Sequence, residues 1–103
     1  MARQMQRLFT EFDAIFTPVF GTVAFEHVEE ADWRKRRLTI NGAEEPFAPQ
    51  IAWIGQATYP GLPAVSVPVG SSGHLPIGIQ VIAPHWQDHS AIALAGLLHN
   101  LIS

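Results

Sequence analysis

The chain has 103 residues, enough for one domain over 1–103 with a small core. Six Lys and Arg residues oppose nine Asp and Glu residues, and this net charge of −3 argues against nucleic acid or an anionic membrane as the partner. No cysteine is present, which excludes disulfide bonds and thiol catalysis. Charged residues make up 15% of the chain against about 25% in typical soluble domains, so we expect part of the surface to be covered by another body.

The N-terminal segment predicts a helix over 1–12, because four apolar residues recur at the spacing of one helical face: Met5, Leu8, Phe9 and Phe12. Charged residues within this segment exclude the apolar core of a signal peptide, and no apolar run is long enough to cross a membrane. Together with the absence of cysteine, this favours a cytoplasmic protein. The following DAIFTPVF predicts a short buried strand that Pro18 ends.

Residues 21–50 are interpreted mostly as loop. Within them, RRLTINGAEEPF predicts a small hairpin that turns at Asn41-Gly42, a favoured two-residue pair. The basic run 34–37 follows acidic residues and is interpreted as a solvated strip rather than a phosphate-binding patch. Residues 51–58 predict a short helix, which the Pro- and Gly-rich cluster 59–63 ends.

The stretch PAVSVPVGSSGHLPIGIQVIA predicts two strands joined by a turn at 70–73. Alternation places Val and Ile side chains on one face of this hairpin and small or polar side chains on the other, where a helix, a backbone or a ligand could approach closely. Pro68 cannot donate to a ladder, so it belongs at an edge or a bulge.

The last predicted helix has its cap at Asp88 or Ser90 and runs to about Leu101. Its apolar stripe comprises Ala91, Leu94, Ala95, Leu98 and Ile102. His99 lies near the C-terminal end of this helix. The order helix, strand, long loop, strand pair and helix predicts an α/β fold with too few strands for a complete sheet sandwich.

Ser71 and Ser72 are the first candidates for catalysis. A serine nucleophile needs a base within hydrogen-bond reach and donors for the oxyanion. The candidate bases are five histidines and Lys35, which lies inside the basic run. Because Gly and Ser also supply the dihedral angles of a turn, we favour a bend between strands over a nucleophile.

His85 and His89 stand four residues apart, a spacing that can bind zinc on one helical turn. Pro84 and the cap at Asp88 place His85 before the helix, and the glutamate of an HExxH motif is missing. We therefore favour a structural or surface role, and a zinc module completed by a third histidine remains a weaker alternative.

Large aromatic residues could line an apolar pocket, although core packing is favoured: Trp33, Trp53, Trp86, Phe16 and Phe20. Trp53 lies in an apolar segment and is expected in the core. Trp86 stands beside the start of the last helix, where we expect it to pack as a staple.

Taken in order, several segments resemble the C-terminal end of the amidase signature family of serine hydrolases. FDAIFTPVF resembles the family's strand-and-proline element, and RRLTINGAEEPF is similar to a loop that precedes a tryptophan segment, here IAWIGQAT. YPGLPAVSVPVG and LPIGIQVIAPHWQDHSAIALAGLLH resemble the closing strands and final helix. Two departures are His74, where glycine is usual, and Thr58, where many members have asparagine.

The resemblance implies hydrolysis of a carboxamide through an acyl-enzyme by a serine, a second serine on a cis peptide bond and a lysine. In the family these groups lie upstream of this region, so no catalytic role carries over to Ser71, Ser72 or Lys35. We expect the C-terminal part of an amidase, an incomplete piece of its α/β/α sandwich, which supplies scaffold and a pocket wall but is inactive alone. No catalytic residue, metal or cofactor is expected, and the substrate-binding residues stay unassigned.

The alternative is a stand-alone binding or self-assembly module derived from an amidase tail. In either case the expected partner is protein: the missing N-terminal amidase portion, or a second copy of this chain. The low charge fraction is the reason, because large exposed apolar areas mark interfaces.

Overall fold

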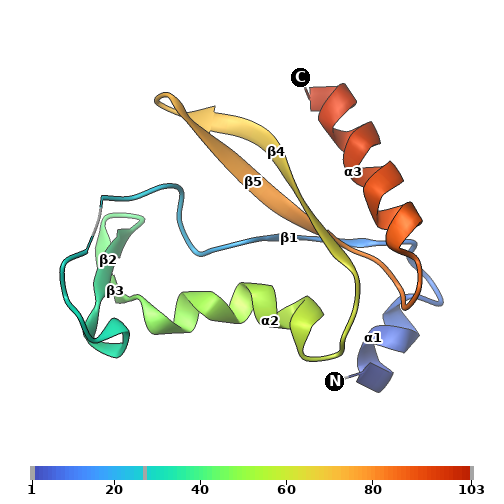
Figure 1. The fold of residues 1–103 in the computed structure, drawn as a ribbon, viewed down its shortest axis with the longest axis horizontal. Helices are drawn as coiled ribbons and strands as arrows, with labels where there is room; N and C mark the ends of the chain where they lie inside the picture. Colours follow the sequence, from blue (N-terminus) through green and yellow to red (C-terminus); the bar gives the residue numbers. More distant parts are fainter. Residues whose placement is uncertain (1, 27, 103) are drawn as a thin grey trace.

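The structure, a computed structural model, describes residues 2–26 and 28–102. Its regular elements follow the chain in this order: α1 (Ala2–Leu8), β1 (Ile15–Pro18), the 3-10 turn η1 (Trp33–Lys35), β2 (Arg37–Ile40), β3 (Ala43–Pro46), the 3-10 turn η2 (Ala48–Ile51), α2 (Ala52–Thr58), β4 (Ala64–Ser72), β5 (Leu75–Ile82) and α3 (Asp88–Ile102). Helices and strands are mixed, as expected for an α/β protein (Figure 1).

Three strands form an antiparallel sheet in the order β1-β5-β4. The predicted long hairpin is confirmed: Val67 lies opposite Ile79, and Ser66 lies opposite Gln80. β4 is an edge strand, and its register shifts immediately after Pro68. Pro68 therefore occupies both the edge and the irregularity that its missing N–H favours.

One face of this sheet packs against α3 and forms the core. Val67, Val81 and Ala95 make up the buried cluster, and Leu94 and Leu98 pack around it. Small side chains let the helix approach the strands closely, as Ala91 and Ala95 are both buried. The predicted stripe of α3 is thus confirmed over its first four members, whereas Ile102 at its end is 50% exposed.

The opposite face of the sheet carries small and polar side chains, and its Gln80 reaches α2. Gln80 is buried, and its Nε2 donates to the backbone carbonyls of Trp53 at 2.6 Å and Pro18 at 3.2 Å. Gly78 lies on the same face, and an added Cβ there would come within 3.3 Å of the Val67 carbonyl oxygen. The two hydrogen bonds of Gln80 hold two segments that are distant in the sequence against β5.

The second sheet is the predicted hairpin of β2 and β3. Asn41 and Gly42 have φ angles of 53° and 80°, the left-handed values that a tight two-residue hairpin turn requires. Beside this hairpin, Phe20 lies 5.6 Å from both Phe25 and Phe47, centroid to centroid. The segment interpreted as loop therefore contributes Phe25 and Phe47 to a small aromatic cluster with Phe20.

Several local expectations are wrong. Ser71 and Ser72 still pair with Pro76 and Leu75 of β5. The β4–β5 turn therefore lies at Gly73 and His74. The strand expected to be buried is half-exposed, since β1 lies at the sheet edge. The N-terminal helix ends at Leu8, four residues early.

Trp86 is a further wrong expectation, as it does not pack as a staple: it is 90% exposed and has a φ angle of 65°. Neither predicted cap stands before the last helix. Asp88 is its first residue, and Ser90 Oγ donates to Gln87 Oε1 within the first turn.

The molecule is extended for its size. Its radius of gyration is 15.3 Å, against about 12.8 Å for a compact domain of this length. Its accessible surface is 7472 Å², whereas a compact monomer of this mass would expose about 5,700 Å². Among residues 2–26 and 28–102, no helix has the length and apolarity needed to cross a membrane.

Candidate functional site

The two serines lie near the end of the long hairpin, beside a turn that contains His74. Ser71 and Ser72 are both exposed on β4, and within the described residues neither hydroxyl makes a hydrogen bond to a histidine or lysine. Lys35 lies in η1, beside the β2–β3 hairpin, and is likewise exposed. The structure thus does not bring these three side chains together, and the absence of a catalytic role for them remains a prediction.

The two histidines considered as metal ligands lie on different elements. His85 is in the loop after β5, and His89 is in the first turn of α3. Within residues 2–26 and 28–102, no three His, Asp or Glu side chains gather in a way that could hold a metal ion. His27 lies outside the described residues.

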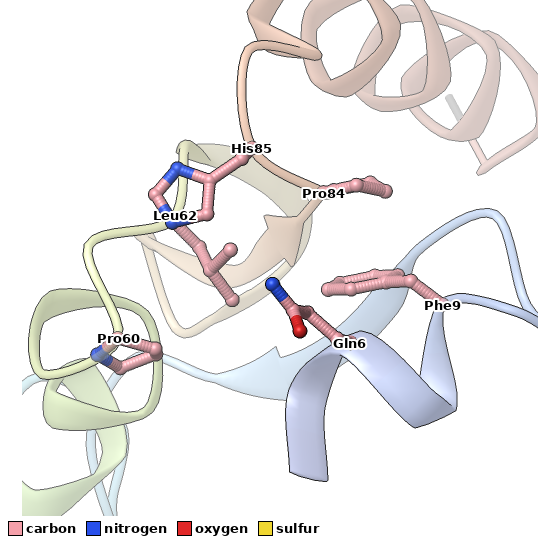
Figure 2. A pocket seen from close by; sticks show the side chains of 6 residues that line it. All are labelled: Gln6, Phe9, Pro60, Leu62, Pro84 and His85. Atoms are coloured by element: carbon pink, nitrogen blue, oxygen red, sulfur yellow. The ribbon is translucent and has the colours of Figure 1, made fainter. Parts of the chain in front are cut away.

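A small cavity lies beside His85, where three segments meet (Figure 2). Its volume is about 260 Å³, and each segment contributes two side chains: Gln6 and Phe9 from α1 and its C-terminal end, Pro60 and Leu62 from the loop before β4, and Pro84 and His85 from the loop after β5. Figure 2 shows the Gln6 amide lying between the Phe9 ring and Leu62. This cavity is the candidate functional site.

The lining of this cavity sets its chemistry. Phe9, Leu62 and the two prolines make it predominantly apolar, and no Lys, Arg, Asp or Glu side chain among the described residues lines it. The Gln6 amide and the His85 imidazole are the two polar groups at the site. The cavity is smaller than a usual site for a drug-sized ligand, about 300–1,000 Å³. It can therefore take an apolar group with one hydrogen-bonding end, or an apolar side chain of a neighbouring protein segment.

The large aromatic residues named from the sequence line other hollows. Trp33 lies across from α2 in a cavity that also contacts Ile54 and Tyr59. Phe20 lines a third hollow between the segment after β1 and the start of β5, where Gly78 also contributes. Trp53 is half-buried and acts through its carbonyl, as described above. Phe16, half-exposed on β1, lines none of these three.

Sequence reasoning found one polar member of the candidate site and missed the other. His85 was considered for its spacing to His89, whereas Gln6 drew no interpretation because it fell off the apolar face of the predicted helix. The loop prolines were interpreted only as breakers of regular structure. The usable signal was that two proline-bearing loops flank the same strand pair, which brings their ends together.

Comparison with known proteins relates the chain to one family. The model of the family described as Amidase matches residues 1–92. The A subunit of the glutamyl-tRNA(Gln) amidotransferase of Koribacter versatilis is 35% identical over an alignment that covers 100% of this chain and 20% of that protein. The corresponding proteins of Deinococcus deserti and Clostridium novyi are 30% and 34% identical, covering 98% and 81% of this chain and 20% and 15% of their own length. The chain spans about one fifth of the length of the first of these relatives.

Proposed function

The chain belongs to the amidase family, and from that premise we propose that it supplies scaffold and part of a pocket wall to an amidase fold while the catalytic groups lie elsewhere. The activity of the complete fold would be hydrolysis of a carboxamide. The observation that carries the proposal is the position of Ser71 and Ser72: exposed hydroxyls near a hairpin end that, among the described residues, make no hydrogen bond to a histidine or lysine, His74 of the adjoining turn included. A serine hydroxyl that makes no hydrogen bond to a base lacks the usual means of activation.

The pocket-wall part of the proposal rests on the cavity at His85. Its lining comes from three segments, and the side chains of His85 and Gln6 are exposed at its margin. An apolar wall with two hydrogen-bonding groups is suited to orienting an amide or its substituent. The rest of such a pocket would come from another part of the amidase fold.

The scaffold part rests on unsatisfied packing. Many large apolar side chains are at least 40% exposed, among them Leu8, Phe12, Phe16, Ile54 and Leu75. They occur on α1, on the sheet, on α2 and on the hairpin end, so the uncovered area is spread over most of the chain. Such a distribution is expected of a piece that packs inside a larger fold.

Ammonia release tests the proposal directly. We expect the purified chain to release no ammonia from glutamine, asparagine or benzamide above the buffer rate. The Ser71→Ala/Ser72→Ala double variant serves as the matched control and should give the same trace. Turnover by the wild-type chain that the double variant lacks would contradict the proposal.

A chimera tests the scaffold role from the other side. In the Koribacter versatilis relative, the segment aligned with this chain is replaced by this chain, and the activity of that protein is measured. We expect a soluble chimera with measurable activity, and we expect the double serine variant of the chimera to match it. A chimera whose activity depends on Ser71 or Ser72 would assign a catalytic role to this segment.

The second candidate function is a stand-alone assembly module, and one observation favours it. The accessible surface exceeds that of a compact monomer by roughly 1,700 Å². A stable protein–protein interface needs about 800 Å² from each partner. The uncovered area of this chain is thus large enough for association with a partner.

A further inference from the structure

The tip of the β2–β3 hairpin is the turn at Asn41 and Gly42, and both residues are exposed. Within the described residues, the Asn41 side-chain amide makes no hydrogen bond, and neither does the backbone N–H of Gly42. An added Cβ at Gly42 would meet no atom within 4 Å. The peptide unit that joins the two residues therefore faces solvent and is not tied to the rest of the fold.

The covalent structure places a nucleophile and an electrophile side by side in this turn. A bond between the Gly42 nitrogen and the Asn41 side-chain carbon Cγ would close a five-membered ring. Glycine has no Cβ to crowd its nitrogen, and its backbone has the widest choice of dihedral angles. Ring closure needs the central peptide unit of the turn to rotate. Because that unit makes no hydrogen bond within the described residues, the rotation breaks none.

The hairpin that carries this turn is held weakly. β2 and β3 form a two-stranded sheet that does not join the three-stranded one, and Figure 1 shows this hairpin at the far end of the molecule from α3. Leu38 is the single buried residue of the two strands. An isolated pair of strands is marginally stable in water. Brief opening of this hairpin therefore costs little free energy and widens the range of backbone angles at Asn41.

The other asparagine of the chain, Asn100, has the opposite setting. It lies in α3, where the regular hydrogen bonding of a helix fixes the backbone angles. Leu101 follows it, and a leucine side chain crowds the nitrogen that would have to attack. The chain thus contains an internal control, with one asparagine in an open turn and one in a helix.

We propose that Asn41 is a site of spontaneous modification, in which the Gly42 nitrogen displaces ammonia from the Asn41 side chain. The bond from the Gly42 nitrogen to Cγ forms, the Cγ–Nδ2 bond breaks, and the proton of the Gly42 N–H leaves with the ammonia. The product is a succinimide, which one water molecule then opens. Addition of water at Cγ gives aspartate, whereas addition at the backbone carbonyl carbon gives isoaspartate. No oxidant, reductant or enzyme takes part.

Isoaspartate at this position alters the hairpin, because the main chain then runs through Cβ and Cγ and gains one atom. The two-residue turn aligns its strands through φ angles of 53° and 80° at Asn41 and Gly42. The added atom disturbs that alignment, beginning with the pairing of Ile40 and Ala43. We therefore expect amide hydrogen exchange in β2 and β3 to be faster in the converted chain, and exchange in β4 and β5 to be unchanged.

Peptide mapping by mass spectrometry follows the reaction in the folded chain, stored in neutral buffer without any added amide. We expect the Asn41 peptide to gain the mass of an amide-to-acid conversion, with isoaspartate and aspartate both present. The Asn100 peptide should keep its mass over the same time. Denaturant should raise the rate at Asn41 by no more than about tenfold, because an exposed turn opens at little cost in free energy.

Two variants separate ring closure from simple mobility of the turn. Asn41→Gln keeps a side-chain amide but would have to close a larger ring, which forms more slowly, so we expect no conversion over the same storage. Gly42→Ala crowds the attacking nitrogen while it loosens the hairpin, so conversion at Asn41 should become slower. A rate set by mobility alone would instead rise with Gly42→Ala.

Each result decides the proposal. Conversion at Asn41 that spares Asn100, survives folding and is absent in Asn41→Gln supports it. An Asn41 peptide of unchanged mass, equal conversion at both asparagines, a folded rate more than about tenfold below the denatured rate, or faster conversion with Gly42→Ala would overturn it.

The ammonia released at Asn41 is distinguishable from amide turnover. It is limited to one molecule per chain, requires no added amide and should be unchanged in the Ser71→Ala/Ser72→Ala double variant. Turnover would continue past that limit and would need a substrate. Failure of this proposal and failure of the proposed function therefore give different results.

Discussion

The side-chain amide of Gln80 donates to the backbone carbonyl of Trp53 at 2.6 Å and so joins β5 to α2. The two residues are 27 positions apart, and the same nitrogen also donates to the Pro18 carbonyl. One buried side chain thus holds three segments together on the face of the sheet away from α3. No other side chain hydrogen bond in the described residues links the sheet to α2.

Replacement of Gln80 should destabilise the fold. Gln80→Met keeps the approximate volume but removes the side-chain donor to the Trp53 carbonyl, while the Pro18 carbonyl still accepts from Thr17 Oγ1, at a cost of about 1–3 kcal/mol in the free energy of unfolding. Gln80→Glu should cost more at neutral pH, because a carboxylate would then face two carbonyl oxygens. Urea denaturation at fixed protein concentration measures both. Gln4→Glu on the exposed side of α1 is the control, and equal losses at both positions would contradict the bracing role.

The turn at Asn41-Gly42 should depend on glycine. Gly42→Ala places a Cβ on a residue with a φ angle of 80°, which costs about 1–2 kcal/mol. We expect amide hydrogen exchange in β2 and β3 to accelerate by about tenfold, since 1.4 kcal/mol corresponds to a factor of ten. Gly70→Ala is the control, because its added Cβ also meets no atom within 4 Å but Gly70 does not have a positive φ angle. Equal acceleration in β2 and β3 with the control variant would argue against this account.

Replacement of Trp86 by glycine should leave the protein more stable than replacement by alanine. Its indole is 90% exposed, so either change removes little buried surface. Its φ angle of 65° strains any side chain with a Cβ, and glycine relieves that strain. We expect Trp86→Gly to be more stable than Trp86→Ala by about 1 kcal/mol in thermal unfolding. The opposite order would mean that the loop does not hold this conformation in solution.

Val81 should contribute strongly to the core beneath α3. It is fully buried, and Val81→Ala removes two methyl groups at a cost of about 2 kcal/mol, including the cavity left behind. Urea denaturation measures the loss. Val23→Ala, the same change at a side chain that is 40% exposed, should stay within about 0.5 kcal/mol. A loss of stability at Val81 as small as the loss at Val23 would mean that α3 does not pack on this face.

Local patterns predicted the elements whose causes are local. Asn41-Gly42 specified its turn because that pair tolerates left-handed backbone angles without outside support. The alternation around Val67 and Ile79 specified the long hairpin and its buried face. Patterns could not place the candidate cavity, because Gln6 and His85 meet only when three distant segments fold together. For the same reason, residue spacing could not identify the family. The resemblance of several segments, taken in order, did.

Two features that local patterns placed wrongly, the β4–β5 turn and Trp86, show what such patterns cannot predict. The GSSG letters favoured a turn at 70–73, but strand pairing resumes after the register shift between Pro68 and Gly70 and continues through Ser72. Trp86 had the position of a staple, yet the backbone of its loop directs the indole into solvent.

The order of helices and strands, the two hairpin pairings and the helix face that contacts the sheet were determined by the sequence alone, because periodicity and turn residues act over a few positions. Tertiary structure decided which apolar faces stay uncovered and which polar side chain braces the sheet. Those outcomes depend on contacts between segments that the chain brings together only on folding, and short-range patterns carry no record of them.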